Sequence, residues 1–320
     1  MNKRERVIAA VNGGHVDRVP AGFWLHFEKE HQHGKAAVKA QIDFFKQTQT
    51  DILKIMNENL LPDFSPIKTA DDWKRVRPIN VKDKLVQDQL DIIKRVTDEL
   101  KGEVVILSTI HGLVASTFHS RGGDTQYEER SSILPAHLRE NPDIFSRALE
   151  IISEGLAVYA QASLEAGAEG IYYAALGGEM TLFTDEEHRR YIKPNELMIL
   201  DAVKHAPVFN VLHICRDYVN LNRFSEYNPT VVNWAVHANN PGFKEGLACF
   251  EGAAVLGGLD DHGGVLETGT EDEIEKAVFS LIDQMGTEKY IVGADCTLPT
   301  RIDYHRIRTA VEATEKYGRK

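Results

Sequence analysis

The chain has 320 residues, of which 42% are hydrophobic and 27% charged, and its formal net charge is −11. This composition supports a large packed core. The acidic balance argues against a nucleic-acid-binding protein, which needs a basic surface to replace phosphate counterions. No stretch reaches the ~18 to 20 continuous apolar residues that span a bilayer, so we expect no membrane association.

The cysteines and the first residues bear on the cellular compartment. The three cysteines, Cys215, Cys249 and Cys296, are too few and too scattered for a disulfide framework, and fit a reducing compartment. The charged start, Met1 to Arg6, has no apolar segment of the secretory type. We therefore expect a cytoplasmic protein, with Cys249 in a structural role.

Short apolar runs alternate with amphipathic stretches along the whole chain. The candidate strands are Val19–His26, Asp51–Asn57, Val104–Ile110, Gly170–Leu176, Val208–Cys215, Val231–His237, Ala253–Asp260 and Tyr290–Cys296. These runs are continuously hydrophobic, which is typical of parallel strands buried on both faces. Helical patterns cover Lys35–Thr48, Val86–Leu100, Asn141–Ala166, Asp185–Ala206, Glu271–Met285 and Tyr304–Tyr317, and Thr184 and Thr270 are candidate helix caps. The order predicts a single-domain (β/α)8 TIM barrel over residues 1–320, with a doubly wound open sheet as the alternative.

Residues with functional side chains occur where these strands end, which is where barrels of this kind place their active sites. The positions are Trp24, His26, Glu58, His111, Glu179, His213, Cys215, His237, Asp260 and Cys296. Glu179 is a candidate fourth metal ligand or substrate contact. For Asp260 three roles stay open: a substrate contact, a carboxylate that orients His213, or a cap on the next turn.

His213, Cys215 and Cys296 carry the most specific chemical signal. An imidazole and a thiolate two positions apart in a strand project to the same side, and the third residue comes from a distant strand end. Two cysteines and one histidine form an open three-ligand zinc set of the catalytic type, and sulfur ligands favour zinc over magnesium or calcium. We therefore predict one bound Zn²⁺.

The chain also resembles a known superfamily, that of uroporphyrinogen decarboxylase and the zinc-dependent, corrinoid-linked methyltransferases. The similar segments are Arg4–Val11 with Asp17–Pro20, Asp51–Met56, Val255–Asp260 with Glu267–Thr270, and the closing Gly293–Pro299. The resemblance implies a distorted barrel with its site in a cleft at the strand ends. Members are often dimeric, so a homodimer is one expectation.

The resemblance leaves two enzyme branches open. The metal-free decarboxylase branch holds its carboxylate-rich tetrapyrrole through arginines after the first strand, but here no arginine occurs between Arg18 and Arg75. This disfavours carboxylate recognition of that kind. The methyltransferase branch has His-x-Cys after the fifth strand and a Cys after the eighth, which His213, Cys215 and Cys296 match. Arg216 departs from the glycine often found beside this motif.

The leading hypothesis is therefore a zinc-dependent methyltransferase that moves a methyl group between a corrinoid and a small thiol. The sequence contains no Asp-x-His-x-x-Gly segment, so the corrinoid is expected on a separate protein. The first alternative is uroporphyrinogen decarboxylation, with Asp260, Tyr172 and His305 as site groups. The second is non-catalytic binding of a methylated small molecule or a corrinoid carrier in an aromatic pocket around Trp24 and Phe27.

Overall fold

The computed structural model describes residues 1–61, 67–120 and 131–318. Its eight strands are all parallel to their neighbours and close into a barrel in the order β1 to β8. They are β1 (Ala21–Gly22), β2 (Ile52–Ile55), β3 (Val105–His111), β4 (Gly170–Ala175), β5 (Val211–Ile214), β6 (Val231–Trp234), β7 (Ala254–Leu259) and β8 (Tyr290–Ala294). Pairing of β1 with β8 confirms the (β/α)8 barrel and excludes an open doubly wound sheet.

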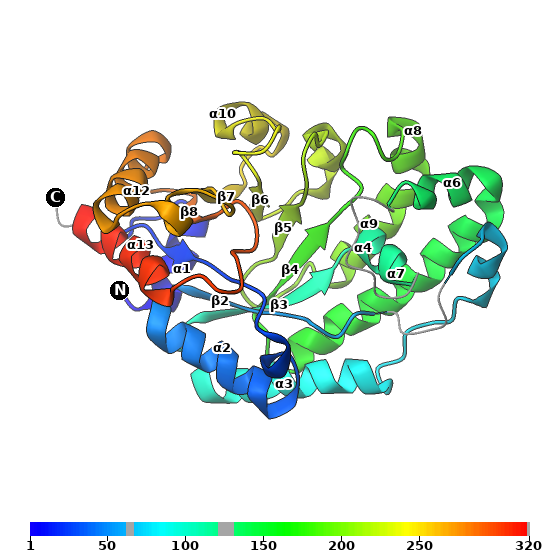
Figure 1. Ribbon diagram of the computed structural model, residues 1–320, viewed down its shortest axis with the longest axis horizontal. Helices are drawn as coiled ribbons and strands as arrows, with labels where there is room; N and C mark the ends of the chain where they lie inside the picture. The colour runs from blue at the N-terminus through cyan, green and yellow to red at the C-terminus, as the bar shows by residue number, and fades with distance from the viewer. Residues whose placement is uncertain (62–66, 121–130, 319–320) are drawn as a thin grey trace.

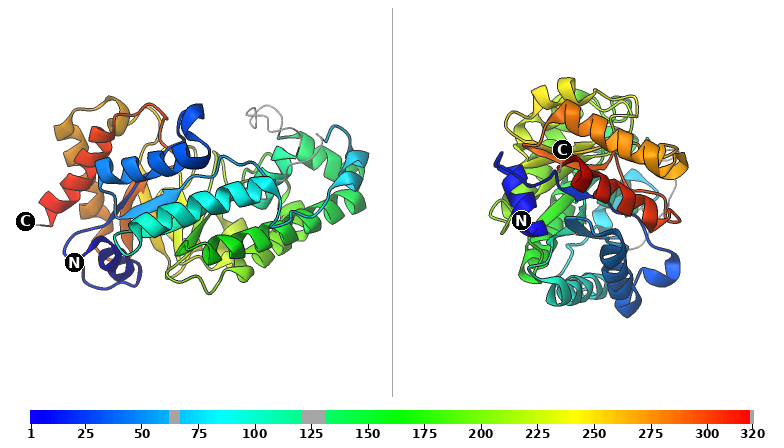
Figure 2. Two further views of the ribbon diagram at one scale, coloured as in Figure 1. Left: turned by 90° about the horizontal axis from the view of Figure 1, so that it is seen from below. Right: turned by 90° about the vertical axis from the view of Figure 1, so that its left-hand side faces the viewer.

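Helices surround the strands, and the two termini lie together at one end of the molecule (Figure 1). The helices are α1 (Lys3–Val11), α2 (Gly34–Thr48), α3 (Lys84–Leu100), α4 (Leu113–His119), α6 (Ile133–Glu140), α7 (Pro142–Glu165), α8 (Asp185–Glu187), α9 (Lys193–Ala202), α10 (Phe243–Gly246), α11 (Val265–Thr268), α12 (Glu271–Met285) and α13 (Tyr304–Tyr317). Short 3₁₀ turns are η1 (Lys29–His31), η2 (Ala70–Arg75), η4 (Leu221–Tyr227) and η5 (Leu247–Cys249). The long helix α7 and its neighbour α6 extend the molecule away from the termini (Figure 2).

Two predicted elements differ from the structure. The first strand was expected over Val19–His26, but β1 comprises only Ala21–Gly22, and Leu25 forms an isolated bridge with Leu298. Pro20 lacks the N–H that would extend the ladder. The helix expected over Asp185–Ala206 is divided by a π turn, η3 (His188–Ile192), and ends at Ala202. Pro194 follows this π turn and cannot donate the regular helical hydrogen bond.

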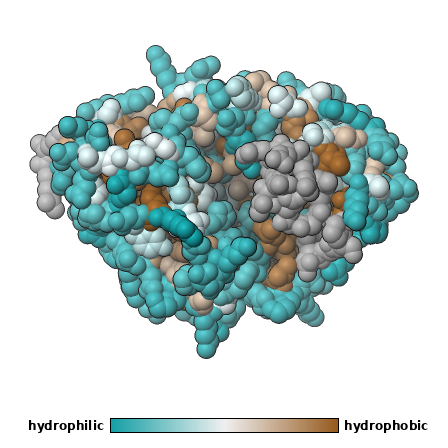
Figure 3. Space-filling view, viewed as in Figure 1, coloured by the Kyte–Doolittle hydropathy of each residue, from teal (hydrophilic) through white to brown (hydrophobic). Residues whose placement is uncertain are grey.

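The barrel interior and the layer between strands and helices form one hydrophobic core. The strand residues are almost completely buried, as β7 illustrates with six buried positions out of six. The face shown in Figure 3 is mainly hydrophilic, with apolar residues in small, separated groups. In the described part of the chain, no helix combines the length and apolar character that crossing a bilayer requires.

Candidate metal centre

Three potential ligand side chains converge at the carboxyl ends of β5 and β8. His213 lies in β5 and Cys215 directly follows it, so strand alternation directs both side chains to the barrel interior. Cys296 lies two residues beyond β8. All three ligand atoms lie within 4.8 Å of one another, and no other such group occurs in the described residues. The structure thus brings together the three residues that the sequence predicted as a set.

Hydrogen bonds hold the two cysteine segments in place. The Cys215 N–H donates to the Ala175 carbonyl at 3.0 Å. The buried Asp295 carboxylate accepts hydrogen bonds from the backbone N–H and the Nδ1 of His237, at 2.7 and 3.0 Å. Asp295 directly precedes Cys296, so these two bonds connect the segment after β6 to the segment that contains Cys296.

Asn233 of β6 fixes the orientation of the His213 ring. Its amide nitrogen donates to the carbonyls of Leu256 and Ala294, at 2.8 and 3.2 Å. Its oxygen must therefore accept, and the Nδ1 of His213 lies 2.6 Å from it. This bond requires a proton on Nδ1, which leaves the lone pair of Nε2 free to face the cysteines. Asn233 was missed in the sequence, although it is a lone polar residue in an apolar strand.

The spacing of the donor atoms fits zinc. The two sulfur atoms are 3.9 Å apart, and the Cys296 sulfur lies 3.3 Å from His213 Nε2. A tetrahedral zinc ion has bonds of ~2.3 Å to sulfur and ~2.0 Å to nitrogen, which separates two sulfurs by ~3.8 Å and sulfur from nitrogen by ~3.5 Å. Two of the three donor separations are thus close to those of a zinc site, and all three donor atoms lie within 4.8 Å of one another.

The two thiols also influence each other. A hydrogen bond from Cys215 stabilises the Cys296 thiolate and lowers the pKa of Cys296 well below its ordinary value. The same bond raises the pKa of Cys215, because losing its proton would leave two buried thiolates side by side. A bound cation removes this conflict by stabilising both thiolates.

A cavity of about 440 Å³ opens beside the three ligands. Its lining includes Lys54, Thr109, His111, Tyr172 and Arg216, together with His213, Cys215 and Cys296. A volume of this size is typical of small-molecule sites. The cluster therefore has space next to it for a small substrate.

Lys54 and Tyr172 form a layered arrangement with His213. The Tyr172 ring stacks on the His213 ring, with centroids 5.3 Å apart, and the Lys54 Nζ lies 4.4 Å from the Tyr172 centroid. The Tyr172 hydroxyl donates to Asn233 at 3.1 Å. Burial and the nearby thiolates raise the pKa of Tyr172, so its hydroxyl keeps its proton. Lys54 was not among the site residues predicted from the sequence, although a single lysine within an apolar strand could have indicated a functional role.

Two predicted histidines also line the cavity. His111 ends β3, and its ring meets that of His119 edge to face with centroids 5.1 Å apart. Burial lowers the pKa of His111 well below its ordinary value, which keeps the ring neutral. His26 lies at a more exposed position and pairs with Glu58 at 2.7 Å. Glu58 thus reaches the site through His26.

Three other predicted site residues stand apart from the cavity lining. The Glu179 carboxylate accepts the Gly177 N–H at 2.8 Å and is outside the three-residue cluster. His237 pairs with Asp295, and this bond raises the pKa of His237. Asp260 accepts the His262 N–H at 3.0 Å and so stabilises the turn. Asn233, and not Asp260, is bonded to the Nδ1 of His213 in the structure.

The groups considered for the two alternative functions do not assemble. His305 lies at the start of α13 and pairs with Glu271 at 2.9 Å, whereas Tyr172 is inside the barrel. The buried Trp24 packs edge to face on Tyr172, and Phe27 packs on Phe44 of α2. Trp24 and Phe27 therefore belong to different contacts rather than to one aromatic pocket.

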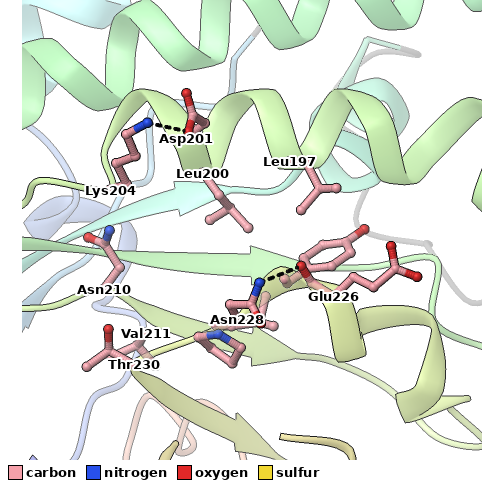
Figure 4. Close-up of a pocket in the computed structure, with 12 residues that line it drawn as sticks. Leu197, Leu200, Asp201, Lys204, Asn210, Val211, Glu226, Asn228 and Thr230 are labelled. Atoms are coloured by element: carbon pink, nitrogen blue, oxygen red, sulfur yellow. Dashed lines mark hydrogen bonds and ion pairs between the residues drawn. The ribbon is translucent and has the colours of Figure 1, made fainter.

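A second cavity, also of about 440 Å³, lies between α9 and the starts of β5 and β6, at the opposite end of the strands (Figure 4). Several of its polar groups are paired with protein atoms. Lys204 pairs with Asp201 at 2.8 Å, and the Asn228 amide donates to the Glu226 carbonyl at 3.2 Å. This cavity lies away from the candidate metal ligands.

Fold and site together define a (β/α)8-barrel protein with an open sulfur-and-nitrogen ligand cluster at the strand ends. Residues 52–317 match the family model described as uroporphyrinogen decarboxylase (URO-D). The match covers most of the chain, so the protein belongs to this family.

Two similar curated proteins are named as methyltransferases. The chain is 24% identical over 217 residues to the methylcobamide:CoM methyltransferase MtbA of Methanosarcina acetivorans, covering 68% of this chain and 60% of the relative. It is 23% identical over 251 residues to MtbA of Methanosarcina mazei, covering 78% and 70%. A solved methyltransferase from Methanosarcina mazei superposes with a TM-score of 0.77 at 17% identity over 99% of both chains. That structural likeness supports the shared fold.

Proposed function

We propose that this protein is a zinc-dependent methyltransferase that moves a methyl group between a corrinoid, carried by a separate protein, and a small thiol. The observation that carries the proposal is the convergence of His213, Cys215 and Cys296 with the spacing of zinc ligands. The methylcobamide:CoM methyltransferases among the relatives support the reaction class.

In this proposal, different residues would bind the metal, orient its ligands and accommodate the thiol. Cys215, Cys296 and the Nε2 of His213 would hold the metal, and Asn233 would keep the His213 ring in the binding tautomer. When bound, zinc supplies a Lewis acid that lowers the pKa of a coordinated thiol. The adjacent cavity would hold the rest of the thiol molecule. In the transfer towards the thiol, the sulfur would lose its proton to solvent and gain the methyl group as the cobalt–carbon bond of the methylated corrinoid breaks, and the electron pair of that bond would stay with the corrinoid.

Metal analysis of full-length protein purified without chelator tests the ligand set. We expect about one zinc per chain in the wild type, because all three donors are preformed. Cys215→Ser and Cys296→Ser should lose most of it. Cys249→Ser is the matched control, since Cys249 lies in η5 and contacts Asn222 rather than the cluster.

Methyl transfer from free methylcobalamin to a set of small thiols, in the presence of zinc, tests the activity. The wild type and Cys249→Ser should form the thioether, whereas the two ligand variants should be inactive. A wild type without zinc, or ligand variants with undiminished turnover, would refute the proposal.

A further inference from the structure

Lys54 is a buried cation within the site. It lies in β2, and its neighbours in the strand are the buried apolar residues Ile52, Leu53 and Ile55. Only 3% of Lys54 is exposed, yet its side chain lines the cavity that contains Cys215 and Cys296. Burying an ammonium group is costly, so a lysine here requires a compensating interaction.

The described residues provide little of this compensation. Lys54 Nζ forms no hydrogen bond within the described part of the chain. It lies over the ring faces of Tyr172 and Trp24, at 4.4 and 5.3 Å from the ring centroids. Ring faces attract a cation, but they leave the three N–H donors without acceptors. Cys296, Glu58 and Cys215 attract Lys54 through their charge, but none of them accepts a hydrogen bond from its Nζ, and the Glu58 carboxylate is bonded to His26. Burial accordingly lowers the pKa of Lys54 to about 7.

The rest of the cavity has the same electrostatic character. None of the described residues that line it is acidic, although the chain as a whole has a net charge of −11. Arg216 lines it as a second cation, and its φ of +85° lies in a region that favours glycine. A strained non-glycine residue at a ligand cavity indicates a function for its side chain. Positive groups are thus concentrated around the space next to the candidate metal.

We propose that Lys54 is a specificity-determining residue whose ammonium binds a carboxylate or sulfonate carried by the small molecule in this cavity. This inference rests on the proposed function in taking that molecule to be the thiol substrate. The missing acceptors of Lys54 are then supplied by the ligand. A charge-assisted hydrogen bond of this kind provides both affinity and discrimination against uncharged thiols.

Calorimetric titration of zinc-loaded protein with short thiols of different charge tests the inference. The probes are 3-mercaptopropionate, 2-mercaptoethanesulfonate, neutral 2-mercaptoethanol and cationic cysteamine. The wild type should bind at least one of the two anions about tenfold or more tightly than the neutral thiol, and cysteamine most weakly. Comparing the carboxylate with the sulfonate distinguishes the two anion classes. In Lys54→Met the preference for anions should disappear.

Lys204→Met is the matched control, because it removes the same charge from the lining of the opposite cavity (Figure 4). It should retain the preference. Lys54→Met should also raise the thermal stability of ligand-free protein, since an apolar side chain replaces a buried cation. A lysine with a purely structural role would lower stability when replaced.

Sulfur-free anions separate this inference from the proposed function. Propionate and ethanesulfonate should bind metal-free wild type more tightly than metal-free Lys54→Met, whether or not zinc-dependent transfer occurs. If the protein failed to bind zinc but the wild type still bound these anions more tightly than Lys54→Met, the proposed function would be refuted and the anion site at Lys54 would be supported. Equal binding of anionic and neutral probes by the wild type, or an unchanged preference in Lys54→Met, would overturn the Lys54 inference.

Discussion

The His213 ring is oriented by one amide, and this makes Asn233 a residue with a measurable effect on metal affinity. Asn233→Leu keeps the volume of the side chain but removes the acceptor that fixes the proton on Nδ1. The ring then loses its preferred tautomer and orientation, so we expect zinc affinity to fall by about 10- to 100-fold. Competition with a chromogenic chelator measures the change.

The control for this prediction is Asn222→Leu, at an exposed position of η4. It should leave the zinc affinity unchanged. Circular dichroism would verify that Asn233→Leu keeps its helical content, so that a loss of zinc reports on the ligand and not on unfolding. Unchanged affinity in folded Asn233→Leu would show that Asn233 does not orient the ligand.

Glu196 makes the stability of the protein depend on pH. It is fully buried in α9 and accepts hydrogen bonds from the hydroxyls of Tyr173 and Tyr227, at 3.0 and 2.7 Å. Burial raises its pKa from 4.5 to about 7. A raised carboxyl pKa means that its contribution to stability is full below pH 4.5 and is lost as the pH rises to about 7. The shift corresponds to roughly 3 kcal/mol.

Glu196→Gln should therefore remove this part of the pH dependence. Urea unfolding between pH 4.5 and 8 would show the wild type losing stability relative to the variant as the pH rises. Glu226→Gln, an exposed residue paired with Lys193, is the control and should follow the wild type. Parallel curves for the wild type and Glu196→Gln would contradict the assignment.

At the scale of elements, the sequence predicts which segments form strands or helices better than it predicts how long each element is. All eight strands occur close to their expected positions, because continuous apolar runs leave little choice for buried parallel strands. The shortness of β1 and the π turn between α8 and α9 were not predicted. Both depend on how the backbone near Pro20 and Pro194 meets its neighbours, and such tertiary geometry is not encoded in hydrophobic periodicity.

The same distinction applies to the site. His213, Cys215 and Cys296 could be grouped because their residue types and strand positions already point to a metal. Lys54 and Asn233 could not be assigned to the site from the sequence. Each is a single polar residue in an apolar strand, and its role depends on which residue its side chain faces in the folded barrel. Asn233 lies beside His213 only through the register of β5 and β6.

The start of helix α12 is an element boundary that the sequence predicts correctly, through the helix cap Thr270, and it can be tested by mutation. The Thr270 hydroxyl accepts the Glu273 N–H at 3.3 Å, and the Glu273 carboxylate accepts the Thr270 N–H at 2.7 Å. Thr270→Ala removes half of this capping box, so we expect a loss of about 1 kcal/mol in the free energy of unfolding. Urea denaturation measures it. Thr270→Ser, which keeps the hydroxyl, should retain most of the stability, and equal losses in both variants would count against the cap.

At the scale of the whole molecule, a buried ionic network helps to close the barrel at the end away from the metal. Asp51 is fully buried just before β2 and binds Arg6 of α1 at 2.8 Å and Arg18, which precedes β1, at 2.8 Å. It also accepts the Ala21 N–H at 2.9 Å. One carboxylate thus joins the first helix to the first two strands, where β1 itself provides only two paired residues.

Asp51→Asn would leave two arginines without their buried counter-charge. Removing one member of such a network costs about 3–5 kcal/mol, whereas loss of an exposed pair costs well under 1 kcal/mol. We therefore expect a large decrease in the urea midpoint of Asp51→Asn, and almost none in Asp98→Asn, whose partner Lys94 is on the exposed face of α3. Because the network lies at the opposite end of the strands from Cys215 and Cys296, the folded fraction of Asp51→Asn should bind zinc with wild-type affinity. A small stability change would show that the short β1 is held by packing alone, and a parallel loss of zinc affinity would show that the two ends of the barrel are coupled.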